Sequence, residues 1–286
     1  MQVIRTIRGL RVWRNHLTSG RHPLGFVPTM GALHEGHRTL IQRARRRCRT
    51  VVVSVFVNPL QFGPREDFAE YPRTLRADLT MCRQEGVELV FAPSIQEFYP
   101  SDFQTTVSVN RLTRRWEGAI RPTHFAGVTT VLTKLFNLVK PDFAFFGQKD
   151  YQQAVVIKQL VKDLHLGVTV IVCPTAREPD GLAYSSRNQY LSSVQRRHAT
   201  VLPKALAIGA NALKEGRRSL RAVSRLMADM LQAEPGVTVE YVAICDAHTL
   251  EPLRRPQRDM VLLGAIRLGR TRLIDNRLVK AARWPR

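Results

Sequence analysis

Apolar residues in the first 175 positions gather in short runs that alternate with stretches of helical periodicity. The run at 51–57, Val-Val-Val-Ser-Val-Phe-Val, is continuous and β-branched, which is typical of a strand buried on both faces of a parallel sheet. Further strands are predicted at 24–29, 87–91, 142–146 and 168–173, with helices after Gly36 and at 74–85, 126–140 and 150–164. This alternation predicts βαβ units in a doubly wound, parallel α/β sheet.

The pattern changes after about residue 180, where helical stretches become longer and the strands fewer. Ser192 and Gln195 have the spacing of a capping box, so a helix is expected to begin there. Helices are predicted at 194–214 and 219–233, and short strands at 237–244 and 260–266. The sequence therefore predicts two domains, residues 1–184 and a smaller α+β domain at 185–286.

The composition suits a globular protein in a reducing compartment. The 286 residues are 44% hydrophobic and 23% charged, and no stretch approaches the ~20 apolar residues of a membrane span. The N-terminus shows no apolar core of a secretory signal. The four cysteines lie far apart and form no CxxC pair: Cys48, Cys82, Cys173 and Cys245. We therefore expect a cytoplasmic protein without a disulfide framework, a structural zinc site or a membrane partner.

The charge is strongly basic, with 44 Lys and Arg against 23 Asp and Glu, a formal net charge of +21. Such a charge attracts anions, which include nucleic acids, nucleotides and carboxylates. The run Arg43-Ala44-Arg45-Arg46-Arg47 raises the possibility of a nucleic-acid-binding module, although no RNA-recognition aromatic motif or finger spacing accompanies it. A solvated helix face explains the run equally simply, as it does the arginines of 217–225.

The first candidate site is Pro-Thr-Met-Gly-Ala-Leu-His-Glu-Gly-His at 28–37, where a predicted strand turns into a helix. Free N–H groups at a helix N-terminus attract an anion, and two imidazoles three residues apart can reach phosphate oxygens. A zinc protease would need HExxH, which this spacing fails. The simpler interpretation is a glycine-rich turn with two surface histidines.

Two more polar segments follow predicted strands. The loop at 56–63 carries Gln61, whose amide suits recognition of a hydroxyl or a carboxylate. The segment at 145–153 carries Lys149, which can hold a phosphate as a compact charge, and Gln153 lies one helical turn after Asp150. Taken alone, the first is more simply a loop and the second a surface ion pair with a helix cap.

The fourth segment, at 178–188, places a Pro-Asp-Gly turn before Ser185, Ser186 and Arg187. Two hydroxyls and a guanidinium make a good clamp for a polyphosphate, and the simpler interpretation is a polar loop with a helix cap. Four polar segments at the strand ends of one sheet are improbable by coincidence.

These segments together resemble the pantoate–β-alanine ligases (pantothenate synthetases), through 28–37, 56–75, 121–142, 146–153 and 180–191. The resemblance implies a Rossmann-like domain that binds the nucleotide and pantoate, with the smaller domain covering the ATP site. It implies an adenylate-forming enzyme of the HIGH-type nucleotidyltransferase superfamily. Such an enzyme joins (R)-pantoate to β-alanine using ATP and Mg²⁺, releases AMP and pyrophosphate, and forms a homodimer.

The resemblance also assigns residues. The implied catalytic groups, His34, His37, Lys149 and Arg187, act on the phosphates, and His37 matches the position of the proton donor. The implied ATP-binding residues are Met30, Gly31, Ala32, Leu33, His34, Glu35, Gly36, His37, Gly147, Gln148, Lys149, Asp150, Ala176, Tyr184, Ser185, Ser186 and Arg187. Gln61 matches a position that contacts pantoate and β-alanine, and Gln153 one that contacts pantoate. No protein side chain is assigned to Mg²⁺, which the ATP phosphates would mainly hold.

The sequence departs from the family pattern at Gln148, where glutamate is commoner, and at Tyr184, where a smaller residue is usual. Residues 61–78 are a weak candidate for a flap over the site. Two other functions stay open at this point. Another HIGH-type nucleotidyltransferase would need a phosphate pocket in place of the Gln61–Gln153 pair, and a basic nucleic-acid-binding protein would show salt-dependent RNA retention. We expect only small-molecule substrates and no specific nucleic acid.

Overall fold

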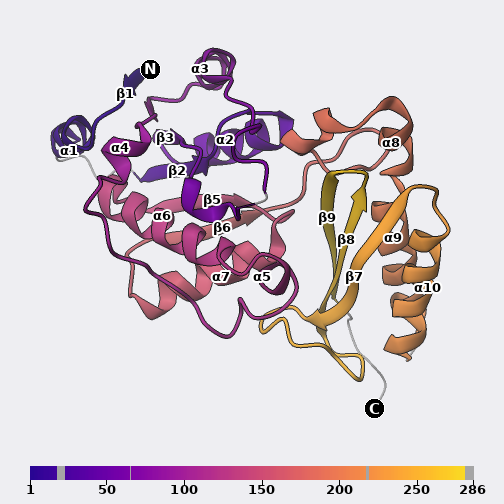
Figure 1. Ribbon diagram of the computed structural model, residues 1–286. Helices are drawn as coiled ribbons and strands as arrows, with labels where there is room; N and C mark the ends of the chain where they lie inside the picture. Colours follow the sequence, from indigo (N-terminus) through magenta and orange to yellow (C-terminus); the bar gives the residue numbers. More distant parts are fainter. Residues whose placement is uncertain (18–22, 65, 217–218, 281–286) are drawn as a thin grey trace. The chain divides into compact units, whose positions relative to one another are not determined.

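The computed structural model describes residues 1–17, 23–64, 66–216 and 219–280 (Figure 1). The chain forms two compact units, of which the first comprises 1–147 and 152–174 and the second comprises 148–151 and the residues from 175 onward. The division follows Pro174, earlier in the chain than the predicted boundary after Tyr184. Hydrogen bonds tie the intervening residues to the second unit, as described below. The last part of the predicted second domain, 281–286, lies outside the described residues.

The first unit is built on a six-stranded sheet in which neighbouring strands pair in parallel. Its order is β1-β4-β3-β2-β5-β6, with β1 (Gln2–Ile4), β2 (Leu24–Thr29), β3 (Thr50–Val55), β4 (Leu89–Phe91), β5 (Phe143–Gly147) and β6 (Thr169–Cys173). The chain moves from β2 to β3 and β4 on one side, then returns to place β5 and β6 on the other. The predicted doubly wound parallel sheet is therefore confirmed, with β1 as a short addition that the pattern did not predict.

Helices cover both faces of this sheet (Figure 1). They are α1 (Ile7–His16), α2 (Glu35–Arg47), α3 (Leu75–Gln84), α4 (Ile95–Phe98), α5 (Glu117–Ile120), α6 (His124–Val139) and α7 (Tyr151–Asp163). Successive strand residues enter different cores, because Cβ atoms alternate between the faces. Phe26 packs in the core that α1, α6 and α7 share, whereas Val27 packs in the core beneath α2 and α3. This double burial explains the continuous apolar runs.

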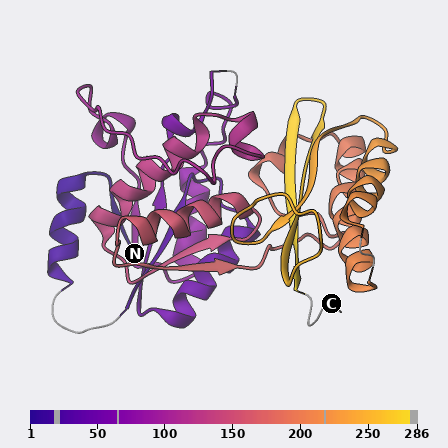
Figure 2. The same cartoon turned by 90° about the horizontal axis from the view of Figure 1, so that it is seen from below.

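The second unit contains an antiparallel sheet of β7 (Val237–Asp246), β8 (Asp259–Leu268) and β9 (Thr271–Lys280). In Figure 2, α9 (Val201–Lys214) and α10 (Leu220–Gln232) lie side by side along this sheet, and their apolar faces share one core with it. The expected α+β character is confirmed. Over the described ranges, no helix is long and apolar enough to cross a membrane.

The helix predicted at 194–214 is two helices, α8 (Ser193–His198) and α9. The predicted capping box is present at the start of α8, where Ser192 and Gln195 bond each other's backbone amides at 3.0 and 3.2 Å. The interruption falls just before Pro203, which has no N–H to donate to the carbonyl of Ala199 and therefore favours a break. Strand β9 was not predicted; it carries Asp275 and Asn276, which bind Arg177 and the carbonyls of Gln148 and Lys149.

Candidate active site

The predicted site segments all begin at the carboxyl ends of neighbouring parallel strands. Strands β3, β2, β5 and β6 are adjacent in that order, and the segments at 56–63, 30–37, 148–153 and 174–188 follow them. The winding direction reverses at β2, so the turn at 30–37 stands at the switch point where open α/β sheets bind ligands.

Three consecutive backbone amides of that turn, those of Gly31, Ala32 and Leu33, donate to side chains of the protein itself. Gly31 donates to Thr29 Oγ1 at 3.1 Å. Ala32 and Leu33 donate to the two carboxylate oxygens of Asp78 at 3.2 and 2.8 Å. Asp78 lies on α3 and is 1% exposed. No local pattern signals this buried carboxylate, because its partners are backbone groups 45 and 46 positions away.

Asp78 fixes a turn that has unusual backbone angles. Gly31 has φ +85° and Ala32 has φ +50°, both in the left-handed region. A Cβ on Gly31 would stand 3.0 Å from Asp78 Oδ2, so the close approach as well as the dihedral favours glycine. Burial raises the pKa of the Asp78 carboxyl, while hydrogen bonds from Leu33, Thr74 and Ala32 lower it in part.

The two histidines of the turn use one ring nitrogen each on the backbone. His34 N donates to His37 Nδ1 at 3.3 Å, and Gly36 N donates to His34 Nδ1 at 3.1 Å. His37 N in turn donates to the His34 carbonyl at 2.8 Å. In an imidazole whose Nδ1 accepts a hydrogen bond, the ring proton is on Nε2. The ring centres of the pair are 4.1 Å apart.

Gln61 is buried and joins the second segment to the first. Its Nε2 lies 2.7 Å from Met30 Sδ, and its Oε1 accepts from Asn58 Nδ2 at 3.2 Å. Asn58 also donates to the carbonyl of Gly127 at 3.0 Å, which anchors the loop on α6. A Cβ on Gly127 would lie 2.3 Å from the Leu60 carbonyl oxygen, so this contact between loop and helix requires glycine.

The main chain at Gln61 is held by residues that sequence reasoning did not single out. The Gln61 carbonyl accepts from His124 Nδ1 at 2.9 Å and from Arg121 Nη2 at 3.2 Å. Arg121 also forms a two-pronged ion pair with Glu66, at 2.8 and 2.5 Å. Burial and the neighbouring Arg121 lower the pKa of His124 to about 4, so this ring is neutral. The pair ties the candidate flap at 61–78, of which Arg65 lies outside the described residues, to the start of α6.

The adjacent glutamines of α7 have different environments. Gln152 is buried, accepts from the Glu117 amide at 3.0 Å and donates to the carbonyls of Leu112 and Arg115. Gln153 is half-buried on the first turn of the helix. Gln152 therefore stabilises the 112–117 loop, whereas Gln153 is more exposed.

The Lys149 segment is held by β9. Asn276 Nδ2 donates to the carbonyls of Gln148 and Lys149 at 2.8 and 2.9 Å, and Gln148 Nε2 donates to Asn276 Oδ1 at 3.1 Å. The predicted Lys149–Asp150 ion pair is loose, with Nζ 3.6 Å from the carboxylate. Gln148, which departs from the usual glutamate, is thus one half of a matched amide pair.

The segment before the candidate clamp folds back on itself. Tyr184 N donates to the Ala176 carbonyl at 3.1 Å, so these two predicted ATP-binding positions are hydrogen-bonded neighbours. Arg177 pairs with both oxygens of Asp275 of β9 at 2.7 and 3.0 Å. These contacts explain why residues 175–184 belong to the second unit.

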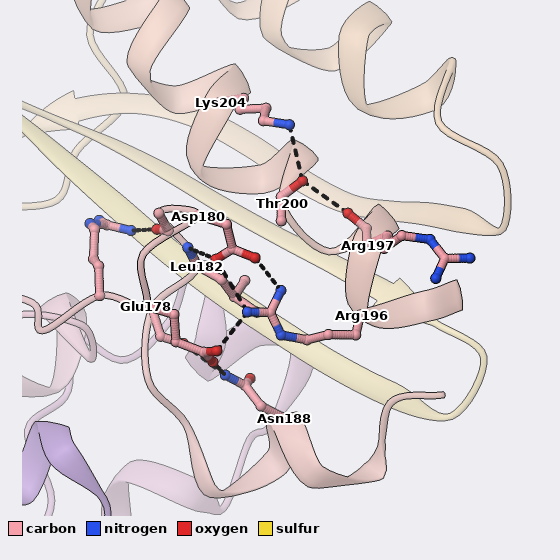
Figure 3. Close-up of polar contacts among 11 residues, drawn as sticks. Glu178, Asp180, Leu182, Asn188, Arg196, Arg197, Thr200 and Lys204 are labelled. Carbon is pink, nitrogen blue, oxygen red and sulfur yellow. Dashed lines mark hydrogen bonds and ion pairs between the residues drawn. The ribbon is translucent and has the colours of Figure 1, made fainter. Parts of the chain in front are cut away.

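Arg196 of α8 fixes the tip of this segment (Figure 3). Its guanidinium donates to Glu178 at 2.6 Å and to Asp180 at 2.7 Å, and its hydrogen bond lowers the pKa of Asp180. Glu178 also accepts from Asn188 Nδ2 at 2.9 Å. Asn188 directly follows Arg187, so the carboxylate connects the tip to the 3₁₀ turn at Ser186–Tyr190.

The predicted phosphate clamp is also a local cap. Ser185 Oγ accepts from the Arg187 amide at 3.3 Å and begins the 3₁₀ turn. The simpler interpretation of a polar loop with a cap therefore agrees with the structure.

A doubly wound sheet with a histidine-bearing turn at its switch point defines a Rossmann-like α/β protein of the nucleotide-binding kind. The family model described as pantoate-beta-alanine ligase matches residues 2–278. The chain belongs to the pantoate-beta-alanine ligase family and is a ligase.

Curated relatives match over almost the whole chain. Pantothenate synthetase from Pelotomaculum thermopropionicum is 49% identical over 279 residues, covering 98% of this chain and 99% of the relative. The enzyme from Acidothermus cellulolyticus is 50% identical over 284 residues, covering 98% and 92%. Neither another type of nucleotidyltransferase nor a nucleic-acid-binding protein is favoured by these relatives.

Solved structures agree with the fold. Pantothenate synthetase from Thermus thermophilus is 46% identical, with a TM-score of 0.92 and coverage of 97% of this chain and 99% of that chain. The ligase from Francisella tularensis is 33% identical, with a TM-score of 0.80 and 97% coverage of both chains. That structure is a complex with Beta-gamma ATP and Beta-alanine.

Proposed function

We propose that this ligase condenses (R)-pantoate with β-alanine through a pantoyl adenylate, releasing AMP and pyrophosphate. The observation that carries the proposal is the family match over residues 2–278, together with a site in which the histidine turn contacts Gln61. The ATP and β-alanine of the Francisella tularensis complex support the same substrates here.

The adenylate route follows from the chemistry of the two substrates. A carboxylate does not react with an amine at neutral pH unless its oxygen becomes a good leaving group. A pantoate oxygen attacks the α-phosphorus, a bond to that phosphorus forms, and the bond to the pyrophosphate oxygen breaks. The β-alanine amine then attacks the acyl carbon, loses a proton to water, and AMP leaves. The first step requires mainly positioning and charge neutralisation.

His34 and His37 are proposed to bind the phosphates through Nε2–H. The backbone amides that donate to both Nδ1 atoms support this role, because they orient each ring and favour the tautomer with the proton on Nε2. A second support is that the amides of Gly31, Ala32 and Leu33 already donate within the fold, so side chains are proposed to contribute to phosphate recognition there. Donors fixed before the reaction are most effective where charge grows in the transition state.

Lys149 and Arg187 are proposed to neutralise the triphosphate, with Ser185 and Ser186 as hydroxyl donors. A planar guanidinium fits two oxygens of the leaving pyrophosphate, and an ammonium acts as a point charge. Mg²⁺ bound to ATP would reduce the negative charge on the phosphates. Over the described residues no group of three or more His, Cys, Asp and Glu side chains is arranged to hold a metal ion, so the ATP phosphates are proposed as its main ligands.

Gln61 and Gln153 are proposed to hold pantoate. The Gln61 amide Nε2 faces a thioether, which is a weak acceptor, so a pantoate hydroxyl or carboxylate oxygen is a better partner. Asn58 holds this side chain through its Oε1, and Arg121 and His124 hold the main-chain carbonyl of the same residue. We further propose a homodimer in a reducing, cytoplasmic setting, consistent with four buried, reduced cysteines.

The test is AMP formation from ATP with pantoate and β-alanine added separately and together. We expect pantothenate and free AMP only when all three substrates are present. With ATP and pantoate alone we expect a single turnover of pyrophosphate, the AMP group remaining in the enzyme-bound pantoyl adenylate. AMP formation that depends on β-alanine but not on pantoate would refute the proposed order. Production of ADP would refute the adenylate.

A further inference from the structure

We propose that Asn276 of β9 is a positioning residue for Lys149. The proposal rests on the function proposed above, in which Lys149 binds the ATP phosphates. Asn276 does not itself contact the nucleotide in this account, and it acts by fixing the backbone from which the lysine extends.

The geometry is unusual because one side chain fixes both peptide groups around Lys149. The Gln148 carbonyl belongs to the peptide before the Lys149 Cα, and the Lys149 carbonyl belongs to the peptide after it. Asn276 Nδ2 donates to both, at 2.8 and 2.9 Å. The φ and ψ angles of Lys149, and hence the direction of its Cα–Cβ bond, are thereby set by a single amide.

The side-chain amide of Asn276 is itself held in one orientation. Asn276 is 2% exposed, and its Oδ1 accepts from Gln148 Nε2 at 3.1 Å. That third hydrogen bond defines which end of the amide faces the carbonyls, since a flipped amide would set oxygen against oxygen. Asn276 pairs with Leu263 of β8 in the sheet register, so the support is a hydrogen-bonded strand rather than a loop.

The hydrogen bonds from Asn276 are not needed to anchor the start of α7. Lys149 and Asp150 immediately precede α7 at Tyr151, whose hydroxyl separately donates to the Ala247 carbonyl at 2.8 Å. The helix start is therefore anchored elsewhere in the same unit, and the additional hold falls on the residue with the proposed charge. A positioning role for Asn276 follows from this selectivity.

The experiment measures ATP binding to the full chain by calorimetry with Mg²⁺ and without pantoate. We expect Lys149→Ala and Asn276→Ala each to weaken ATP binding, the latter roughly tenfold, the scale for loss of hydrogen bonds that fix a charged group. The double variant should bind no more weakly than Lys149→Ala alone. Additive losses, or unchanged binding in either single variant, would overturn the proposal.

Two further variants separate positioning from mere filling of space. Asn276→Asp preserves shape but sets a carboxylate oxygen against two carbonyls, so it should bind ATP as weakly as Asn276→Ala; full rescue by Asp would overturn the proposal. Gln148→Ala removes the bond to Asn276 Oδ1 without altering β9 and should show a smaller loss, again absent in the Lys149→Ala background. The comparison of Gln148→Ala alone with Gln148→Ala in the Lys149→Ala background keeps the test valid if proteins substituted at position 276 fail to fold.

The matched control is Glu240→Gln, which breaks ion pairs to Arg267 and Arg272 in the same sheet. It should leave ATP binding unchanged, and a loss there equal to that of Asn276→Ala would overturn the proposal by showing that any damage to the sheet suffices. Because binding is measured without pantoate, the result stands apart from the condensation assay. A failure of the proposed function would appear there as absent AMP.

Discussion

Asp78 shows how much a single buried side chain can determine at the residue scale. Its two oxygens accept hydrogen bonds from the amides of Ala32 and Leu33, so these two donors of the histidine turn are used within the fold. A charged group buried in this way is tolerated only where hydrogen bonds replace its hydration. These hydrogen bonds hold the backbone of the turn at Ala32 and Leu33.

Replacing Asp78 with Asn should loosen the turn. The asparagine oxygen accepts one amide, and its NH₂ group then faces the other N–H, which leaves a buried donor unsatisfied at a cost of about 1–3 kcal/mol. We expect lower stability in urea and adenylate formation reduced at least tenfold. Asp102→Asn, at an exposed position, is the control. Full activity in Asp78→Asn would show that the turn does not depend on this carboxylate.

The substitution His34→Asn separates the helix-capping role of His34 from its proposed role in catalysis. His34→Asn retains an acceptor for the first turn of α2, since asparagine is a favoured N-cap residue, but it removes the distal Nε2–H. We expect stability close to that of the parent and adenylate formation reduced by about 10²–10³, the usual cost of one fixed donor. Single-turnover kinetics with ATP and pantoate measure this. A rate within a few-fold of the parent would mean that His34 is only a cap.

His124 predicts how stability depends on pH. Its pKa is about 4 in the folded protein against 6.5 ordinarily, so unfolding takes up a proton between these values. This contribution to stability is complete above pH 6.5 and is lost as the pH falls toward 4. Between pH 7 and 5 the loss is about 2 kcal/mol. His124→Gln should lack that part of the slope in urea titrations, and an identical slope in both proteins would contradict the assigned burial.

At the scale of elements, the hydrophobic pattern predicted the strands that are buried on both faces of the sheet. It missed the elements whose position depends on contacts with distant parts of the chain. The strand at 24–29 was predicted within its observed bounds, because residues buried on both faces leave an unbroken apolar run. The break before α9 was missed because a proline is tolerated in the first turn of a helix and therefore does not clearly mark where the helix begins. The strand β1 was missed because a three-residue strand at the edge of a sheet leaves only a weak hydrophobic pattern.

The candidate site likewise contains residues that the sequence pattern predicted and residues that it missed. Its histidine turn, Gln61 and Lys149 follow strand ends and stand out as polar residues after apolar runs. The residues that hold them, Asp78 and Asn276, stand far away in the chain and inside ordinary helix and strand patterns. Local sequence cannot predict a contact between positions 149 and 276, because it depends on the folding of the second unit.

The contact of η1 (Pro59–Gln61) with α6 gives a prediction at this scale. A Cβ at Gly127 would stand 2.3 Å from the Leu60 carbonyl oxygen and 2.5 Å from the Gln61 amide, both backbone atoms that cannot move independently. Gly127→Ala should therefore destabilise the fold and raise the KM for pantoate more than that for ATP. Gly167→Ala, with nothing within 4 Å of the added carbon, is the control and should be close to neutral. Equal effects on both KM values would indicate general damage.

For the whole molecule, the net charge of +21 resides largely on the surface. Arg43, Arg45, Arg46, Arg47 and Arg49 are all exposed. Arg221 and Arg225 are also exposed, while positions 217 and 218 of that predicted basic stretch lie outside the described residues. Exposed charges are screened beyond about 8–10 Å at physiological salt, so they contribute attraction for anionic substrates rather than a specific site. The basic composition is thus compatible with a small-molecule ligase.

The central claim is that pantoate is activated as an acyl adenylate, and isotope transfer tests it most directly. With ¹⁸O in both carboxylate oxygens of pantoate, one labelled oxygen attacks the α-phosphorus and remains there when the β-alanine amine displaces AMP. Mass spectrometry of the products should find one ¹⁸O in each AMP, one in the amide carbonyl of pantothenate, and none in pyrophosphate. Unlabelled AMP, or label recovered in orthophosphate, would contradict the adenylate.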